Sequence, residues 1–231
     1  MFIILNLIMK IYSFINCSEW INQVIDRIVS SSEKAIHETC RFNIVLTGGS
    51  TPQMIYDQLK NIETEWSSWN FWISDERLPA NDFDNFNSKM IFENFLNFIP
   101  IAKEQVNFIS TNIDIETSIQ LYSKKLGAVD IFDLTLLGIG EDGHTASLFP
   151  GNDWGISPYS SDVLLINNSP KYPTFRVSLS GNRLCRSKEV IFIARGDKKL
   201  DIVKKIENGE HLQLNSVRGI NHTTLYYCIE N

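Results

Sequence analysis

Residues 132–151 read FDLTLLGIGEDGHTASLFPG, and this stretch decides the fold class. Its first six residues are largely apolar with little alternation, which is typical of a strand that is covered on both faces. The strand runs directly into a glycine-rich loop, residues 138–151. A buried strand that ends in such a loop indicates an α/β sheet with functional groups at the carboxyl ends of its strands.

Similar strand, turn and helix patterns flank this stretch. The apolar run 42–47 ends in Gly-Gly-Ser-Thr-Pro, where Ser50 or Thr51 suits the N-cap of a helix and Pro52 suits its first turn. The apolar run 71–74 precedes a polar loop, after which Ser88 is expected to cap the next helix. A buried strand is expected at 10–15, and further strands at 106–109, 163–166, 175–179, 190–194 and 225–229. Helices are expected at 18–38 (capped by Ser18), 115–126 (capped by Asp114) and 198–207.

Strands that alternate with helices imply a mostly parallel sheet with helices on both faces. We therefore predict a single-domain, Rossmann-like α/β fold over residues 1–231, with no internal repeat and no flexible linker. Whether residues 1–8 are an upstream extension, with Met9 as an alternative start, is left open. The apolar run 1–9 follows no positive charge and is too short for a membrane span, so neither a signal peptide nor a membrane anchor is expected.

Composition and charge exclude several functional classes. The chain has 231 residues, 43% of them hydrophobic, a formal net charge of -6 and a pI of about 5.3. An acidic chain is a poor nucleic-acid binder, and an anionic ligand would need local positive groups. Cys17, Cys40, Cys185 and Cys228 lie far apart in sequence, so we expect reduced, mostly buried thiols in a cytoplasmic protein, without a redox or metal role.

Four polar segments follow predicted strands and should meet at one edge of the sheet. The first comprises Gly48, Gly49, Ser50 and Thr51, where free N–H groups at a helix start favour an anion. A plain capped turn is the alternative. The second is Asp75-Glu76-Arg77, which is either a solvated loop or a forked guanidinium contact oriented by an acid.

The third segment contains His144 among glycines, just past the buried strand, with Asp142 two residues away. An imidazole there can accept a proton near neutral pH, and Asp142 can orient it. The spacing fits neither a zinc site nor a Gly-x-Ser-x-Gly nucleophile elbow. Ser147 is expected inside a helical turn with a structural or capping role.

The fourth segment pairs Arg176 with Lys199, two cations at the ends of strands expected to be neighbours. Both flank apolar strands where the ligand cleft should open, so they can supply local positive charge. Arg183, Arg186 and Lys188 are instead expected to be surface residues that only aid solubility.

These four segments resemble the 6-phosphogluconolactonase family, within the glucosamine-6-phosphate isomerase/6-phosphogluconolactonase superfamily. The Gly-Ser-Thr-Pro turn, the Asp-Glu-Arg-x-Pro loop and Asp-Gly-His-Thr-Ala-Ser-Leu-Phe-Pro-Gly occur in the family's order over about residues 10–205. The resemblance implies a fold of the sugar-phosphate isomerase and deaminase type, no metal or organic cofactor, and hydrolysis of 6-phospho-D-glucono-1,5-lactone in the oxidative pentose phosphate pathway.

The resemblance also implies roles for individual residues. His144 is expected to be the general base with Asp142 as its partner. The expected substrate-binding residues are Gly48, Gly49, Ser50, Thr51, Asp75, Arg77, Arg176 and Lys199. The expected partner is a phosphorylated sugar lactone, with no nucleic acid or membrane, and the expected state is a monomer or weak homodimer.

Two alternatives remain beside this interpretation. Glucosamine-6-phosphate deaminases share the fold and a Gly-His loop, but they carry a Glu five residues after the His, where this chain has Phe149. A non-catalytic sugar-phosphate-binding protein is the second alternative. A regulator of that type would need a DNA-binding module, and the acidic chain has no room for one before its first glycine turn.

Overall fold

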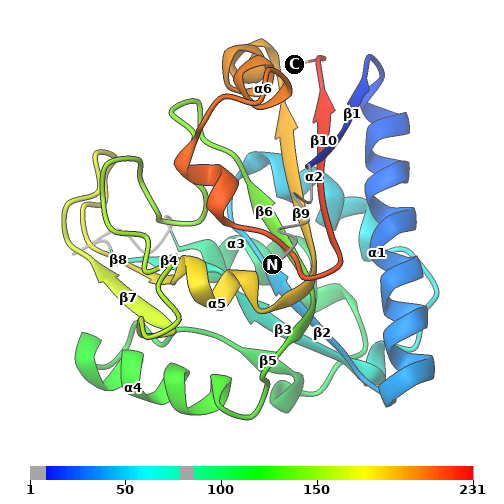
Figure 1. Cartoon of the computed structure of the whole chain (residues 1–231). Coiled ribbons are helices and arrows are strands. Elements are labelled where there is room, and N and C mark those ends of the chain that lie inside the picture. The colour runs from blue at the N-terminus through cyan, green and yellow to red at the C-terminus, as the bar shows by residue number, and fades with distance from the viewer. Residues whose placement is uncertain (1–8, 79–85, 231) are drawn as a thin grey trace, which may run out of the picture.

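A computed structural model describes residues 9–78 and 86–230 (Figure 1). Seven strands form one sheet in the order β1-β10-β9-β6-β2-β3-β5, and every neighbouring pair is parallel. These strands are β1 (Lys10–Phe14), β2 (Phe42–Leu46), β3 (Trp69–Ile73), β5 (Val106–Asn107), β6 (Phe132–Gly138), β9 (Ser187–Arg195) and β10 (His222–Cys228). The predicted α/β class with a mostly parallel sheet is confirmed. The possible extension at residues 1–8 and Pro79 of the Asp-Glu-Arg-x-Pro loop lie outside the described residues.

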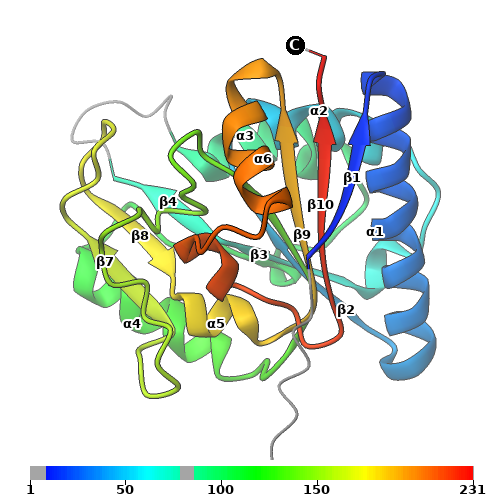
Figure 2. The same ribbon diagram turned by 45° about the horizontal axis from the view of Figure 1, so that its top comes forward.

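Helices cover both faces of this sheet (Figures 1 and 2). The helices are α1 (Cys17–Thr39), α2 (Ser50–Leu59), α3 (Asn87–Asn94), α4 (Ile115–Leu126), α5 (Gly181–Cys185) and α6 (Leu200–Glu207). On one face, Tyr56 of α2 stacks on Phe95 beside Phe71. On the other face, Tyr122 of α4 packs against Trp72, the strand neighbour of Phe71. Successive side chains of β3 thus pack into the hydrophobic cores on opposite faces of the sheet, as expected for a strand covered on both sides.

The central strand β6 is buried along almost its whole length, as its apolar run predicts. The first strand, β1, was expected to be buried, but all of its residues are exposed or half-buried. It lies at the edge of the sheet and pairs only with β10, so only part of its surface meets the core. Among the described residues, no helix combines the length and apolar character that crossing a lipid bilayer requires.

Helix starts agree with the sequence in position but not always in the capping residue. Asp114 caps α4 by accepting the Thr117 N–H, as predicted. Helix α1 is capped by Asn16, whose side chain accepts from Glu19, so the prediction of Ser18 is wrong by two residues. Helix α2 has Gly49 at its N-cap with φ of 114° and no side-chain cap. Neither Ser50 nor Thr51 is the N-cap, since both lie inside the helix, although Pro52 does occupy its first turn.

A second, antiparallel sheet was not foreseen. It has three strands in the order β4-β8-β7, namely β4 (Asp75–Arg77), β8 (Arg176–Leu179) and β7 (Val163–Ile166). The polar segment that follows β3 thus begins with a short strand, because its backbone pairs with β8, which lies about 100 residues away in sequence. Arg176 therefore begins β8 in the small sheet and does not lie on a strand next to β9, which corrects that part of the prediction.

The buried side chain of Glu76 shows why the antiparallel pairing of β4 with β8 matters. Its side chain is fully buried, and its carboxylate accepts the backbone N–H groups of Arg77, Asn87 and Ser88 at 2.7–2.9 Å. Two of these donors lie in the first turn of α3, so the side chain that caps this helix belongs to strand β4. Ser88 lies inside α3 as a donor, and its predicted capping role is wrong.

Glu76→Gln is therefore expected to lower the free energy of unfolding by about 2–3 kcal/mol, because the amide leaves at least one buried N–H without an acceptor. The measurement is equilibrium unfolding in urea. Glu63→Gln, at an exposed position, is the matched control and should change stability by less than about 0.5 kcal/mol. Equal stability of the Glu76 variant and the wild type would contradict the capping role.

The basic residues around α5 were expected to be solvated surface groups, but they make specific contacts within the protein. Arg183 is fully buried, with its guanidinium 3.7 Å from the centroid of the Phe132 ring, and it donates to the carbonyls of Val129 and Asp130. Arg186 forms an ion pair with Asp162. Lys188 pairs with Asp133 at 3.0 Å and with Glu38 at 3.5 Å. Arg183 is thus a structural residue that ties α5 to the turn before β6, and the expectation of mere solubility is wrong for it.

Candidate active site

A cavity of about 400 Å³ opens at the carboxyl ends of the central strands. It collects residues from all four polar segments, as expected for the edge where ligands bind in α/β sheets. The predicted site residues that line it are Gly48, Gly49, Ser50, Thr51, Asp75, Arg77, His144, Arg176 and Lys199. Asp142 reaches the same site through its contact with His144.

The imidazole of His144 and the carboxylate of Asp142 form a close pair. His144 Nδ1 lies 2.5 Å from Asp142 Oδ1, and 17% of the His144 side chain is exposed. A carboxylate only accepts hydrogen bonds, so the geometry assigns the ring proton to Nδ1. Nε2 then carries the free lone pair that a general base requires.

The electrostatic surroundings favour this neutral form. Burial lowers the pKa of His144 below its usual value of 6.5, although the hydrogen bond and charge of Asp142 act in the opposite direction. Burial alone would raise the pKa of Asp142, but its hydrogen bond with His144 and the attraction to that ring lower it overall. At neutral pH the pair therefore consists of a carboxylate and a neutral imidazole.

The loop around this pair depends on a residue without a side chain. A Cβ placed on Gly140 would lie 2.0 Å from His144 Nδ1 and 2.4 Å from Asp142 Oδ1. Gly140 also donates its N–H to the carbonyl of His144 at 2.7 Å. The glycine thus lets the backbone pass directly beneath the pair and fixes where the imidazole lies.

Gly140→Ala is expected to displace the imidazole and to lower kcat by about 100-fold, the usual cost of misplacing a reacting group by an ångström. Imidazole signals in NMR spectra should shift at the same time. Gly138→Ala is the matched control for the ring position, since its Cβ meets nothing within 4 Å, and it should leave those signals unchanged. Unchanged signals in the Gly140 variant would refute the packing argument.

Asp75 is held rigidly at the cavity wall. One of its carboxylate oxygens accepts from Ser74 Oγ at 2.7 Å, and the other accepts from Ser147 Oγ at 2.7 Å. Ser147 is fully buried in a tight turn, where Thr145 and Leu148 form an isolated bridge. Its structural role agrees with the sequence, but the turn is not helical and Ser147 caps no helix.

Positive groups gather around Asp75. Arg77 and Arg176 lie directly opposite each other in the register of β4 and β8, and both line the cavity. Arg176 donates to the carbonyls of Pro173 and Lys171, and burial lowers its pKa while the charge of Asp75 raises it. The buried Nε of Arg77 has no hydrogen-bond partner among the described residues. Two like charges held this close favour an anion between or beside them.

Lys199 and the start of α2 complete the positive surface. Lys199 follows Gly196 just beyond β9, and burial lowers its pKa whereas Glu141 raises it. Helix α2 has no acidic residue in its first turn and no side-chain cap, so its first N–H groups face the cavity without a competing protein anion. The site can therefore hold a strongly negative group.

Lys171 and Tyr172 also line the cavity and were not predicted as site residues. They belong to the irregular segment between β7 and β8, whose only sequence signal is a lysine and a tyrosine between prolines. Neither residue lies at the end of a predicted strand, so the sequence offered no reason to place them at the cavity. Phe149 packs against two of the lining residues, with its ring centroid 4.7 Å from that of His144 and 5.4 Å from the Arg176 guanidinium.

Comparisons with known proteins agree with this geometry. The family model described as glucosamine-6-phosphate isomerases/6-phosphogluconolactonase matches residues 16–226. The 6-phosphogluconolactonase of Thermotoga maritima is 31% identical over 211 residues, which are 90% of this chain and 93% of that protein. Human 6-phosphogluconolactonase is 32% identical over 177 residues, 72% of this chain and 68% of the human protein.

Solved structures show the same likeness. The crystal structure of the Thermotoga maritima 6-phosphogluconolactonase superposes with a TM-score of 0.86 at 30% identity, covering 95% of this chain and 99% of that one. A parallel sheet with a cation-lined cavity and an imidazole at its carboxyl edge defines an α/β enzyme that holds an anionic ligand beside a histidine. The chain belongs to the glucosamine-6-phosphate isomerase/6-phosphogluconolactonase family.

Proposed function

We propose that this chain hydrolyses 6-phospho-D-glucono-1,5-lactone to 6-phospho-D-gluconate, a step of the oxidative pentose phosphate pathway. The observation that carries the proposal is a single cavity that contains both a neutral imidazole and a group of cations. The names of the relatives supply the substrate, and the cavity offers what that substrate needs: a positive surface for the phosphate and a base for the lactone.

In this mechanism, His144 Nε2 removes a proton from a water molecule whose oxygen attacks the lactone carbonyl carbon. Asp142 stabilises the imidazolium that forms. Backbone N–H groups of the glycine-rich loop, or a nearby cation, stabilise the oxygen that becomes negative. The ring oxygen then leaves with the proton returned by His144, so no covalent enzyme intermediate forms. Because the lactone is already reactive, orientation and one base suffice.

Phe149 argues against the deaminase alternative. It is 2% exposed and packs against the His144 ring at the position where deaminases carry their Glu. A phenyl ring cannot transfer a proton, so the ring-opening chemistry of that family lacks its partner group. Release of ammonia from glucosamine 6-phosphate would support the deaminase and contradict our proposal.

The decisive experiment follows freshly generated 6-phosphogluconolactone with and without the purified chain, corrected for spontaneous hydrolysis. We expect the chain to accelerate the disappearance of the lactone and the formation of 6-phosphogluconate. Tight binding of 6-phosphogluconate without any acceleration would instead support the non-catalytic binding protein.

The same proposal covers the domain organisation, the oligomeric state, the cofactors and the compartment of the protein. We infer one domain over residues 1–231, a monomer or weak homodimer, and no requirement for a metal or organic cofactor. The cytoplasm is the proposed compartment, where protein thiols are normally kept reduced. The thiols are less buried than expected, since Cys40 is exposed and Cys17 and Cys185 are half-buried.

A further inference from the structure

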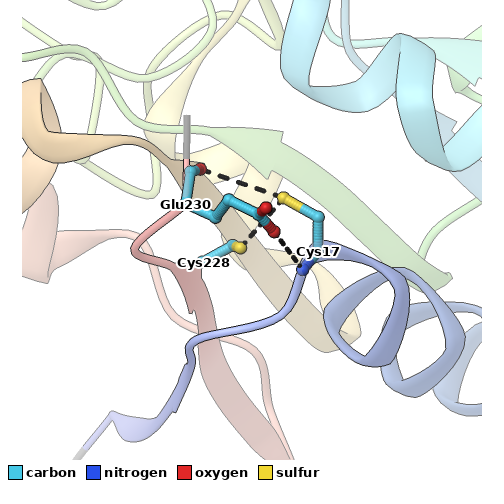
Figure 3. A group of neighbouring side chains, drawn as sticks. All are labelled: Cys17, Cys228 and Glu230. Atoms are coloured by element: carbon cyan, nitrogen blue, oxygen red, sulfur yellow. Dashed lines mark hydrogen bonds between the residues drawn. The ribbon is translucent and has the colours of Figure 1, made fainter.

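Two cysteines at opposite ends of the sequence lie side by side (Figure 3). Cys17 Sγ, in the first turn of α1, is 3.1 Å from Cys228 Sγ, the last residue of β10. Parallel pairing of β1 with β10 creates this contact, because Phe14 lies opposite Cys228 and α1 starts three residues later. From this geometry we propose that Cys17 and Cys228 form a reversible disulfide by exchange with a small-molecule disulfide such as oxidised glutathione.

The surroundings hold the two sulfur atoms in place. Glu230 accepts the backbone N–H of Cys17 at 3.0 Å through Oε2, and its carbonyl oxygen lies 3.8 Å from Cys17 Sγ. The backbone N–H of Ile229 donates to the carbonyl of Phe14. The residues that directly follow β10 are thus tied to the end of β1 and the start of α1, and a bond between the sulfurs needs little backbone movement.

The two thiols differ in access, which sets the order of the reaction. Cys17 is half-buried, whereas Cys228 is buried, and burial together with the hydrogen bond between the two thiols raises the pKa of the Cys228 thiol to about 11. The more accessible Cys17 thiol therefore loses its proton to solvent first, and its sulfur attacks the small disulfide and releases one small thiolate. The Cys228 sulfur then loses its proton to solvent, attacks the Cys17 sulfur and displaces the second small thiolate. In total, two protein thiols are oxidised and one small disulfide is reduced to two thiols.

The cluster also resembles a cation site, since both sulfurs and a Glu230 oxygen lie within 4.8 Å of one another. Thiolates bound to zinc at about 2.3 Å in a tetrahedron lie about 3.8 Å apart. The observed separation of 3.1 Å is shorter, so a metal would require the pair to open. The contact between the sulfurs favours the disulfide.

The disulfide would stabilise the part of the chain that carries the cavity. The carbonyl of Cys228 accepts the N–H of Gly196 at 2.9 Å, and the carbonyl of Gly196 accepts the N–H of Lys199 at 3.0 Å. Lys199 lines the cavity, so the end of β10 supports the turn that positions this lysine. The bond joins the first helix to the last strand across nearly the whole chain, and closing so long a loop restricts the unfolded state strongly.

The test treats the purified full chain with oxidised glutathione and then maps its peptides by mass spectrometry without reduction. We expect loss of the Cys17 and Cys228 thiols, a peptide that links these two residues, and a Tm that is higher by about 5 °C or more. A reducing agent should reverse all three changes. The inference is independent of the proposed function, since none of these measurements depends on activity.

Variants give the controls. Cys40→Ser and Cys185→Ser should leave the linkage and the gain in Tm intact. Cys40 lies at the far end of α1, about 34 Å from Cys17, and the Cys185 sulfur contacts the backbone of Ser216 and Arg218. Cys17→Ser should abolish both. Cys228→Ser should leave Cys17 as a stable mixed disulfide with glutathione, which identifies it as the attacking residue even if the variant is less stable.

Two results would overturn the proposal. One is a chain that keeps Cys17 and Cys228 as free thiols, or as separate glutathione adducts, after full oxidation of exposed Cys40. The other is stoichiometric zinc binding that requires both Cys17 and Cys228 in a chain that forms no linkage between them, which would assign the cluster to a metal instead.

Discussion

His144→Ala is expected to lower kcat for lactone hydrolysis by about 10²–10⁴-fold, the usual contribution of a general base. KM should change little, because the cations that line the cavity remain. The measurement compares turnover with the spontaneous rate at several enzyme concentrations. His211→Ala removes an exposed imidazole elsewhere in the chain and should retain wild-type turnover.

The pH dependence gives this prediction a second readout. The base acts only when neutral, and burial lowers its pKa, so kcat/KM should rise with pH and level off with a midpoint below 6.5. Asp142→Asn removes a hydrogen bond and a charge that raise the pKa of His144, so the midpoint should move to still lower pH. A His144→Ala variant that retains the wild-type turnover and pH profile would contradict the assignment of the base.

Arg176→Ala and Lys199→Ala are each expected to raise KM for 6-phosphogluconolactone by about 10–100-fold, the value of one charge-assisted hydrogen bond. KM for unphosphorylated gluconolactone should change far less, because that substrate has no dianion to bind. Steady-state kinetics with both substrates measure the difference. The two variants also show which of these cations contributes more to phosphate binding.

Lys198→Ala is the matched control for the lysine, since Lys198 is exposed and does not line the cavity. It should leave KM for both lactones near the wild-type value. Equal increases in KM for the phosphorylated and the unphosphorylated substrate would show that Arg176 and Lys199 do not recognise the phosphate.

Much of the site could be predicted because its signals are local. Glycine turns after apolar runs mark the carboxyl ends of strands, and parallel strands bring those ends to one edge. The segments around Gly49, Arg77, His144 and Lys199 therefore had to meet, and the cavity contains all of them. Helix and strand positions followed from periodicity for the same local reason, although α5 and β4 are too short to give a clear period.

Other features depend on contacts between distant segments, which no local pattern encodes. Glu76 looked like part of a solvated loop, yet it caps α3 because β4 pairs with β8 and directs the carboxylate into the protein. Arg183 looked like a surface cation, but burial between Phe132 and two carbonyls makes it structural. Lys171 lines the cavity from an irregular segment whose backbone is held by Arg176 and Ser169, which both donate to the Lys171 carbonyl.

The sequence by itself determined the α/β class and the family resemblance, and it predicted the pairing of His144 with Asp142, because strand patterns and short motifs depend on backbone sterics and short-range spacing. Only the tertiary structure decided that Cys17 meets Cys228, that an antiparallel sheet carries Arg176, and that Lys171 joins the cavity. The physical reason is that strand order and register set these contacts, and both result from packing the whole chain into one core.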